Sequence, residues 1–175
     1  MHGCRVAWVH EGKVAVMRKA KREIKEFADI VAVMRRCDVC RLGIVDDDGV
    51  PYVVPLNFGL EAAGGKVTLY FHSALEGHKL DLLAKNPRVG FEMDCDHKLQ
   101  YFSEKCYCTM AYASVMGKGT VRMIEDPDET LHALDLLMEQ YHHDDDTGYN
   151  PAAISRTRVY ALDVTEITGK QKLPK

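Results

Sequence analysis

Alternating apolar and polar residues predict several β-strands along this chain. The clearest alternation lies between Lys66 and His72, where Val67, Leu69 and Phe71 share one face of the predicted strand. The sequence DDDG at positions 46–49 predicts a tight turn that joins two more strands into a β-hairpin. Including that hairpin, the other strands are predicted at residues 39–45, 51–58, 88–94, 109–124 and 158–167.

Three segments instead have the three-and-four spacing of helices. The first, from Lys21 to Arg35, is predicted by the recurring apolar residues Ile24, Phe27, Ala28, Val31 and Met34. The second runs from Glu76 to Lys85 and ends at Asn86-Pro87, because the residue before a proline disfavours helical geometry. The third starts at Asp126-Pro127, since proline is favoured in the first turn of a helix.

The order of these elements predicts a mainly β fold with helical additions (α+β). Strands follow one another in series without regular strand-helix alternation, which favours an antiparallel barrel over a doubly wound sheet. Gly117 and Gly119 lie inside a long predicted strand and indicate a bend or bulge, as in closed or curled sheets. At 175 residues the chain can bury one substantial core, so one domain is expected.

Charge and hydropathy exclude some classes of partner. The formal net charge is -3, and basic residues are interleaved with acidic ones, so we expect no nucleic acid as a partner. No apolar run approaches the roughly 18 residues that cross a bilayer, and the N-terminus lacks a secretory pattern. A cytoplasmic protein that binds no membrane is expected.

The first 16 residues differ in character from the rest. They show no sustained period, and the basic segment MRKAKR that follows from Met17 resembles the start of a protein. We therefore expect residues 1–16 to be an N-terminal extension and residues 17–175 to form the single domain. A genuine N-terminal strand around Val14 to Met17 is the alternative.

The cysteines and the histidine-rich segment are candidates for metal or redox chemistry. Free thiols are expected for a chain without an export signal, whose six cysteines are Cys4, Cys37, Cys40, Cys95, Cys106 and Cys108. Cys37 and Cys40 have the spacing of half a zinc site or of a thiol redox pair, with Cys106 and Cys108 as an imagined second half. Cys37 follows the C-terminal end of a predicted helix, where the dipole opposes a thiolate. Residues 142–146 (HHDDD) are interpreted as a solvated loop, so no metal site is predicted.

A candidate anion site lies where the strand 66–72 leads into the second helix. Lys79 and His78 fall at the helix start, where the dipole is already positive and cations are disfavoured. An anion between them would remove this conflict, and backbone N–H groups, the Ser73 hydroxyl and the Lys79 ammonium would form a phosphate-binding site. The alternative is that Ser73 caps the helix and Lys79 points to solvent.

The hairpin strand from Pro51 to Phe58 is a candidate for binding a planar ring. Prolines at 51 and 55 are tolerated only where backbone N–H groups need no partner in the sheet, which predicts a free strand edge. An isoalloxazine ring could pair with that edge and with the Asn57 amide. A sheet edge without any ligand is the alternative.

Six motifs along the chain resemble a known family. They appear in the order CRLG at 40–43, DGVPYVVPLNFG at 48–59, LYFHSALEGHKLDLL at 69–83, NPRVGFE at 86–92, TMAYASVMGKG at 109–119 and ITGK at 167–170. This order and spacing are similar to those of the 5-nitroimidazole-resistance group within the pyridoxamine 5'-phosphate oxidase-like, FMN-binding split barrels. The resemblance covers about Met17 to Lys170 and implies a split β-barrel.

The resemblance also implies a set of cofactor-binding residues. It implies a flavin ring lined by Val54, Pro55, Leu56 and Asn57. It implies a ribityl phosphate or ring edge surrounded by His72, Ser73 and Lys79, with Tyr112 and Ser114 on the neighbouring barrel strand. Members of this family are homodimers with two FMN sites at the subunit interface, so a homodimer is expected.

These implications lead to a functional expectation. His72 matches a histidine close to flavin and substrate in the nitroimidazole reductases and is the candidate catalytic residue, with a structural hydrogen bond as the alternative. His78 stands where an arginine is common, which predicts weaker phosphate binding. We expect an FMN-dependent oxidoreductase that reduces a small planar acceptor such as a nitroimidazole, with NAD(P)H as a transient donor. The rivals are a non-catalytic flavin-binding or regulatory protein, a pyridoxamine-phosphate-oxidase-like enzyme, and a haem or deazaflavin binder.

Overall fold

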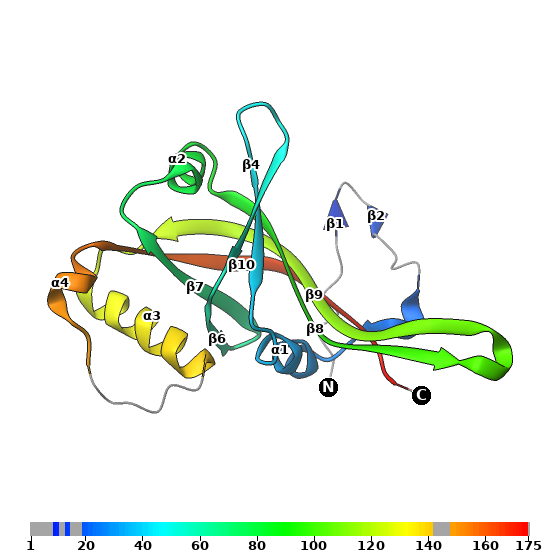
Figure 1. Cartoon of the computed structure of the whole chain (residues 1–175). Coiled ribbons are helices and arrows are strands. Elements are labelled where there is room, and N and C mark those ends of the chain that lie inside the picture. The colour runs from blue at the N-terminus through cyan, green and yellow to red at the C-terminus, as the bar shows by residue number, and fades with distance from the viewer. Residues whose placement is uncertain (1–8, 11–12, 15–18, 142–147, 175) are drawn as a thin grey trace.

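The fold is described by a computed structural model that covers residues 9–10, 13–14, 19–141 and 148–174 (Figure 1). The short N-terminal strands are β1 (Val9–His10), β2 (Lys13–Val14) and β3 (Glu23–Ile24). The longer strands are β4 (Cys40–Val45), β5 (Pro51–Leu56), β6 (Gly59–Ala63), β7 (Lys66–Ala74), β8 (Arg88–Phe102), β9 (Tyr107–Met123) and β10 (Thr157–Lys172). The helices are α1 (Phe27–Met34), α2 (His78–Lys85), α3 (Pro127–Gln140) and α4 (Pro151–Ile154), with 3-10 turns η1 (Ala20–Arg22) and η2 (Ser103–Lys105).

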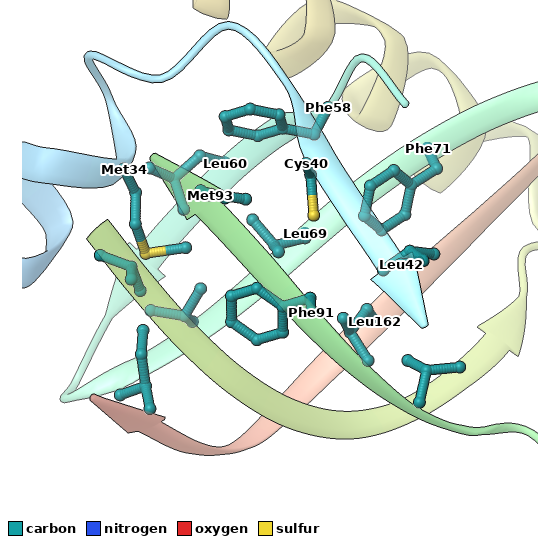
Figure 2. Close-up of a cluster of buried hydrophobic side chains, with 14 of the residues drawn as sticks. Met34, Cys40, Leu42, Phe58, Leu60, Leu69, Phe71, Phe91, Met93 and Leu162 are labelled. Carbon is teal, nitrogen blue, oxygen red and sulfur yellow. The ribbon is translucent and has the colours of Figure 1, made fainter. Parts of the chain in front are cut away.

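An antiparallel sheet forms the body of the protein and confirms the predicted fold class. Its strands are ordered β5-β4-β8-β9-β10-β7-β6, and β3 pairs with β10. The curled sheet encloses one main core of aliphatic, aromatic and sulfur-containing side chains, with Leu69 and Leu162 among those fully buried (Figure 2). Helix α3 packs on the outside of β6 and β7 around a second cluster that includes Tyr70 and Ala133 (Figure 1).

The first predicted helix was wrong in where it begins and only partly right in its buried face, since Phe27 and Val31 pack against the core as predicted. Helix α1 begins only at Phe27, and it buries Ile30, Val33 and Met34, whereas Ala28 is exposed. Ile24 belongs instead to β3 and pairs with Gly169 of β10. A side chain at position 169 would lie about 3.0 Å from the Ile24 Cβ, so the glycine allows this close strand contact. Tertiary pairing therefore overrides the helical spacing here.

Several strand boundaries also differ from the prediction. The strand starting at Pro51 ends at Leu56, and Gly59–Ala63 form β6, which pairs with β7. Strands β8 and β9 pair over most of their length, with a register shift between Cys95 and Lys98, and extend from the barrel as a long hairpin (Figure 1). The polar run from Asp96 to Lys98 concealed this extension in the sequence. Helix α4 was not predicted either.

The bend that Gly117 and Gly119 indicated is present between β9 and β10. Gly119 pairs with Val164, and the register of β10 shifts by one residue between Val164 and Glu166. A bulge of this kind bends the strand and increases its twist, which helps the sheet to curl.

The N-terminal prediction stays open. Strands β1 and β2 pair with each other, and Met17 lies outside the described residues, as do residues 142–147 with the histidine-rich segment. In the described part of the chain no helix is long and apolar enough to cross a membrane.

Candidate functional site

The candidate anion site forms where β7 ends and α2 begins. His72 and Ser73 directly precede Ala74, the last residue of β7. Gly77 precedes α2 with a φ of 147°, a conformation that favours glycine. The N-terminus of α2 has no side-chain cap, so the alternative of Ser73 as a helix cap is wrong. The Ser73 hydroxyl donates to the carbonyl oxygen of Ala74 at 2.9 Å.

His72 and Lys79 lie within electrostatic reach of each other. His72 is an exposed side chain at the end of β7, while Lys79 is half-buried in the first turn of α2. Partial burial lowers the pKa of His72, and the positive charge of Lys79 lowers it further. The imidazole is therefore neutral at neutral pH, and Lys79 supplies the positive charge at this end of α2.

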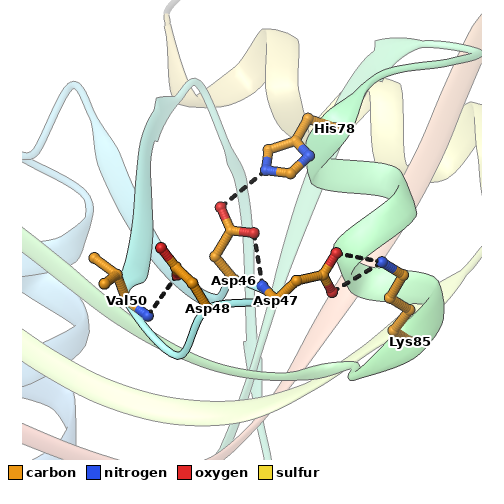
Figure 3. A network of polar contacts seen from close by, with 6 residues as sticks. All are labelled: Asp46, Asp47, Asp48, Val50, His78 and Lys85. Atoms are coloured by element: carbon orange, nitrogen blue, oxygen red, sulfur yellow. Dashed lines mark hydrogen bonds and ion pairs between the residues drawn. The ribbon is translucent and has the colours of Figure 1, made fainter.

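Contacts between side chains hold α2 against the turn of the β4–β5 hairpin (Figure 3). The His78 Nε2 lies 3.0 Å from the Asp46 carboxylate, and the Lys85 ammonium contacts the Asp47 carboxylate at 2.6 Å. Pairing with His78 is the main reason that the pKa of Asp46 is lowered. The His78 ring also meets Tyr52 of β5 edge-on, with 5.1 Å between ring centroids. These contacts bring the two informative segments of the sequence together, and they engage His78 with the hairpin.

Strand β5 has a free edge, as the two prolines predict. Within the described residues it pairs only with β4, where Pro51 and Pro55 stand opposite Val45 and Arg41. A proline nitrogen cannot donate, so these positions suit pairs whose backbone groups point away from β4. In that register the free edge of β5 presents the carbonyl groups of Pro51 and Pro55, together with the N–H and carbonyl groups of Val53.

The four residues predicted to line a ring divide into two groups. Val54 and Leu56 pack their side chains against the core, and in this register their backbone groups point toward β4, so neither residue offers a free group at the edge. Pro55 is exposed on the opposite face of β5. The exposed Asn57 side chain makes no hydrogen bond to another described residue, so its amide is available too.

Tyr112 and Ser114 lie apart from this site within one chain. Strands β4 and β8 separate β9 from the β5 edge. Tyr112 lines a cavity of about 410 Å³ together with the basic residues Arg36, Lys98 and Lys172. A single chain therefore brings the start of α2 to β5 through His78 and Tyr52, but does not bring Tyr112 and Ser114 there.

Tyr112 and Ser114 lie in a strip of outward-facing side chains on β8 and β9. Residues 111, 113 and 115 of β9 face the core, so the intervening side chains point outward. Leu99 pairs with Met110 and Tyr101 with Cys108, which places them on the same face of the sheet. The outer strip comprises Leu99, Tyr101, Met110, Tyr112, Ser114 and Met116, whose apolar members include Tyr101 at 70% exposure and Met116 at 49%.

Sequence reasoning missed one residue beside the site, Tyr160 of β10. Its side chain is fully buried in the core and stacks on Phe71. A tyrosine in an alternating strand is usually a simple core residue, so the sequence contained no signal. Only the pairing of β10 with β7 reveals that it adjoins Ser73.

The thiols form no metal cluster in the described part of the chain. No group of three or more His, Cys, Asp or Glu residues gathers there in a metal-binding arrangement. Cys37 and Cys40 are buried free thiols, and burial raises the pKa of both. The Cys37 thiol and the Cys95 thiol of β8 both donate to the Val33 carbonyl oxygen, at 3.3 and 3.9 Å, a proximity that the sequence spacing did not indicate. Cys106 and Cys108 are exposed in the β8–β9 hairpin.

Comparison with known proteins shows which family and which solved structures this chain resembles. A family model described as pyridoxamine 5'-phosphate oxidase matches residues 26–171. A candidate 5-nitroimidazole antibiotic resistance protein from Bacteroides thetaiotaomicron has a similar structure, with a TM-score of 0.75, 37% identity, and coverage of 85% of this chain and 86% of that chain. No curated protein sequence matches significantly.

More distant structures share the fold. The flavocytochrome Anf3 from Azotobacter vinelandii has a TM-score of 0.73 at 18% identity, covering 91% of this chain and 73% of that chain. An FAD-binding protein from Mesorhizobium loti has a TM-score of 0.60 at 22% identity, covering 87% of this chain and 98% of that chain. A protein named as a flavocytochrome and one named as FAD-binding thus share this fold.

Proposed function

Because this chain belongs to the pyridoxamine 5'-phosphate oxidase family, we propose that it is an FMN-dependent oxidoreductase that reduces a small planar acceptor, such as a nitroimidazole or another nitroaromatic. The observation that carries this proposal is the cation of Lys79 at the start of α2, next to His72 and Ser73. The contact between His78 and Tyr52 brings the start of α2, where Lys79 lies, to strand β5. A ligand that carries a phosphate and a planar ring on one linker, such as FMN, would match this arrangement.

The residues present fit FMN at both of its ends. Lys79, the Ser73 hydroxyl and the backbone N–H groups at the start of α2 would hold the phosphate, since a helix N-terminus favours an anion. The β5 edge offers carbonyl groups at 51 and 55, both groups of Val53 and the Asn57 amide to the polar rim of the ring. When bound, FMN supplies the electron-transfer chemistry, and the protein orients it and limits its contact with water.

His72 is the proposed catalytic residue. In the ligand-free protein its imidazole is neutral, because burial and Lys79 lower its pKa. An anionic group opposite Lys79 offsets that positive charge and raises the pKa again. The protonated fraction of His72 would then increase, and in that form the imidazole would donate its proton to an acceptor that becomes more basic on reduction.

We also propose that the working form is a homodimer. The outer strip is an exposed apolar face, and single chains rarely leave such a face uncovered. Covering it with a second copy would place Tyr112 and Ser114 at the subunit interface. In the dimer these two residues would contribute to the FMN site of the other subunit, although they lie apart from the site of their own chain.

The functional test starts from protein reconstituted with FMN and desalted. It should be yellow and should reduce a nitroimidazole with NAD(P)H as donor. His72→Ala should keep FMN and lose about 10²-fold or more in turnover, because general acid catalysis contributes on that order. His132→Ala is the matched control, since His132 lies on α3 beside Glu61 and should leave turnover unchanged.

Each rival function has its own result in this experiment. Colourless protein after desalting would contradict the cofactor assignment. Yellow protein without turnover on any nitroaromatic or quinone would favour a non-catalytic flavin-binding protein. A different absorption spectrum would identify haem or deazaflavin, and full turnover of His72→Ala would remove His72 from catalysis.

The dimer is tested by placing a charge in the outer strip. Met116→Lys should shift the protein to monomer in sedimentation velocity and weaken FMN binding in parallel, because a buried unpaired charge is strongly unfavourable. Leu131→Lys on α3 carries the same change at a residue of 40% exposure outside the strip and should stay dimeric. A wild-type protein that sediments as a monomer with FMN bound would contradict the proposal.

A further inference from the structure

The buried hydroxyl of Tyr160 has no role in the chemistry described so far. Its side chain is 0% exposed, and its ring stacks on Phe71 with 5.6 Å between ring centroids and an angle of 26°. The hydroxyl oxygen has no hydrogen-bond partner among the described residues. Buried polar groups almost always have partners, so an unpaired hydroxyl next to a binding site needs a reason.

The strand register shows which group the hydroxyl faces. Tyr160 stands opposite Phe71, and Arg158 stands opposite Ser73. Ser73 is therefore the diagonal neighbour of Tyr160 on the same face of the sheet, within reach of a long side chain. Burial raises the pKa of Tyr160, and the adjacent Ser73 hydroxyl opposes that rise. The Ser73 proton itself is engaged by the Ala74 carbonyl at 2.9 Å.

We propose that Tyr160 is a positioning residue for Ser73, and that the two hydroxyls form a relay completed only when an anion binds at the start of α2. This inference rests on the proposed function. When the phosphate is present, the Ser73 hydroxyl turns from the Ala74 carbonyl and donates to a phosphate oxygen. The Tyr160 hydroxyl then donates to the Ser73 Oγ, which satisfies the buried group. Tyr160 does not touch the ligand and acts only through Ser73.

The relay is tested by comparing FMN with riboflavin, which has the same ring but no phosphate. Tyr160→Phe keeps the ring stacked on Phe71 and removes only the hydroxyl. It should weaken FMN binding about three- to tenfold, as for the loss of one hydrogen bond, and leave riboflavin binding unchanged. In a Ser73→Ala background the Tyr160→Phe change should have no further effect, because the partner through which it acts is gone.

Tyr70→Phe is the matched control. Tyr70 is a buried tyrosine of the adjacent strand β7 whose hydroxyl donates to Glu61 at 2.9 Å, away from the site. Its removal should leave the ratio of FMN to riboflavin affinity at the wild-type value. Equal weakening of both flavins by Tyr160→Phe, or no weakening of either, would overturn the relay while leaving FMN binding intact. A wild-type protein that binds neither flavin would overturn the proposed function together with the relay.

Discussion

Lys79→Ala should weaken FMN binding about 10- to 100-fold and leave riboflavin binding nearly unchanged. A hydrogen bond to a charged group contributes about 1.5–3 kcal/mol, which corresponds to that range of affinity. The pKa of His72 should rise in the same variant, because the Lys79 charge is one of the two causes that lower it. Fluorescence titration measures the affinities, and the proton NMR signals of the imidazole measure the pKa.

Lys85→Ala provides the control on the same helix. Lys85 is an exposed lysine at the opposite end of α2, where it pairs with Asp47. Such surface pairs contribute little to stability, so the FMN affinity should change by less than about twofold. If both variants lost the same affinity, the loss would reflect the positioning of α2, and Lys79 would not be the phosphate ligand.

Gly119→Ala should destabilise the protein by about 3 kcal/mol or more, since a tightly packed site must be forced apart. A Cβ at this position would lie 2.2 Å from the Asp163 carbonyl oxygen and 2.9 Å from the Asp163 carbonyl carbon. Both atoms belong to the backbone of β10 next to its bulge, so they cannot move aside like the end of a side chain. In a chain of this length the melting temperature should fall by about 6–12 °C, measured by calorimetry or circular dichroism.

Gly43→Ala is the comparison for this effect. Gly43 also lies inside a barrel strand, but a Cβ there would meet only the Gly90 carbonyl oxygen at 3.8 Å, an ordinary contact. Alanine at this position should leave stability unchanged or slightly raise it, because glycine is unfavourable inside strands. Equal losses for the two variants would show that the close approach of β9 and β10 is not the cause.

The two ends of the candidate site were accessible to sequence reasoning for different reasons. The helix start at Lys79 was found because a cation there conflicts with the helix dipole, which is a local property of the chain. The β5 edge was found because prolines restrict which backbone groups can pair. The roles of Tyr112 and Ser114 came only from family resemblance, and their place on an outer face opposite the core explains why no local pattern marked them.

Two spacings along the sequence did not correspond to the contacts in the structure, for one physical reason. Ile24 has helical spacing with the residues after it, yet it forms a strand because Gly169 of β10 leaves room for it. The spacing of Cys37 and Cys40 in the sequence is that of half a metal site. In the structure, however, the pKa of Cys37 is raised by burial and by the thiol of Cys95 in β8. Sequence spacing describes neighbours along the chain, whereas both contacts join segments more than 50 residues apart.

By itself the sequence determined most of the longer strands, the inward face of β7 and the end of α2. These depend on a period of two and on the geometry before proline, and both are local. Only the tertiary structure decided that α2 rests on the hairpin turn through Asp46 and Asp47, and that Tyr160 lies next to Ser73. The alternation of apolar and polar residues shows which face of a strand is buried, but it does not identify the neighbouring strand that will pair with that strand.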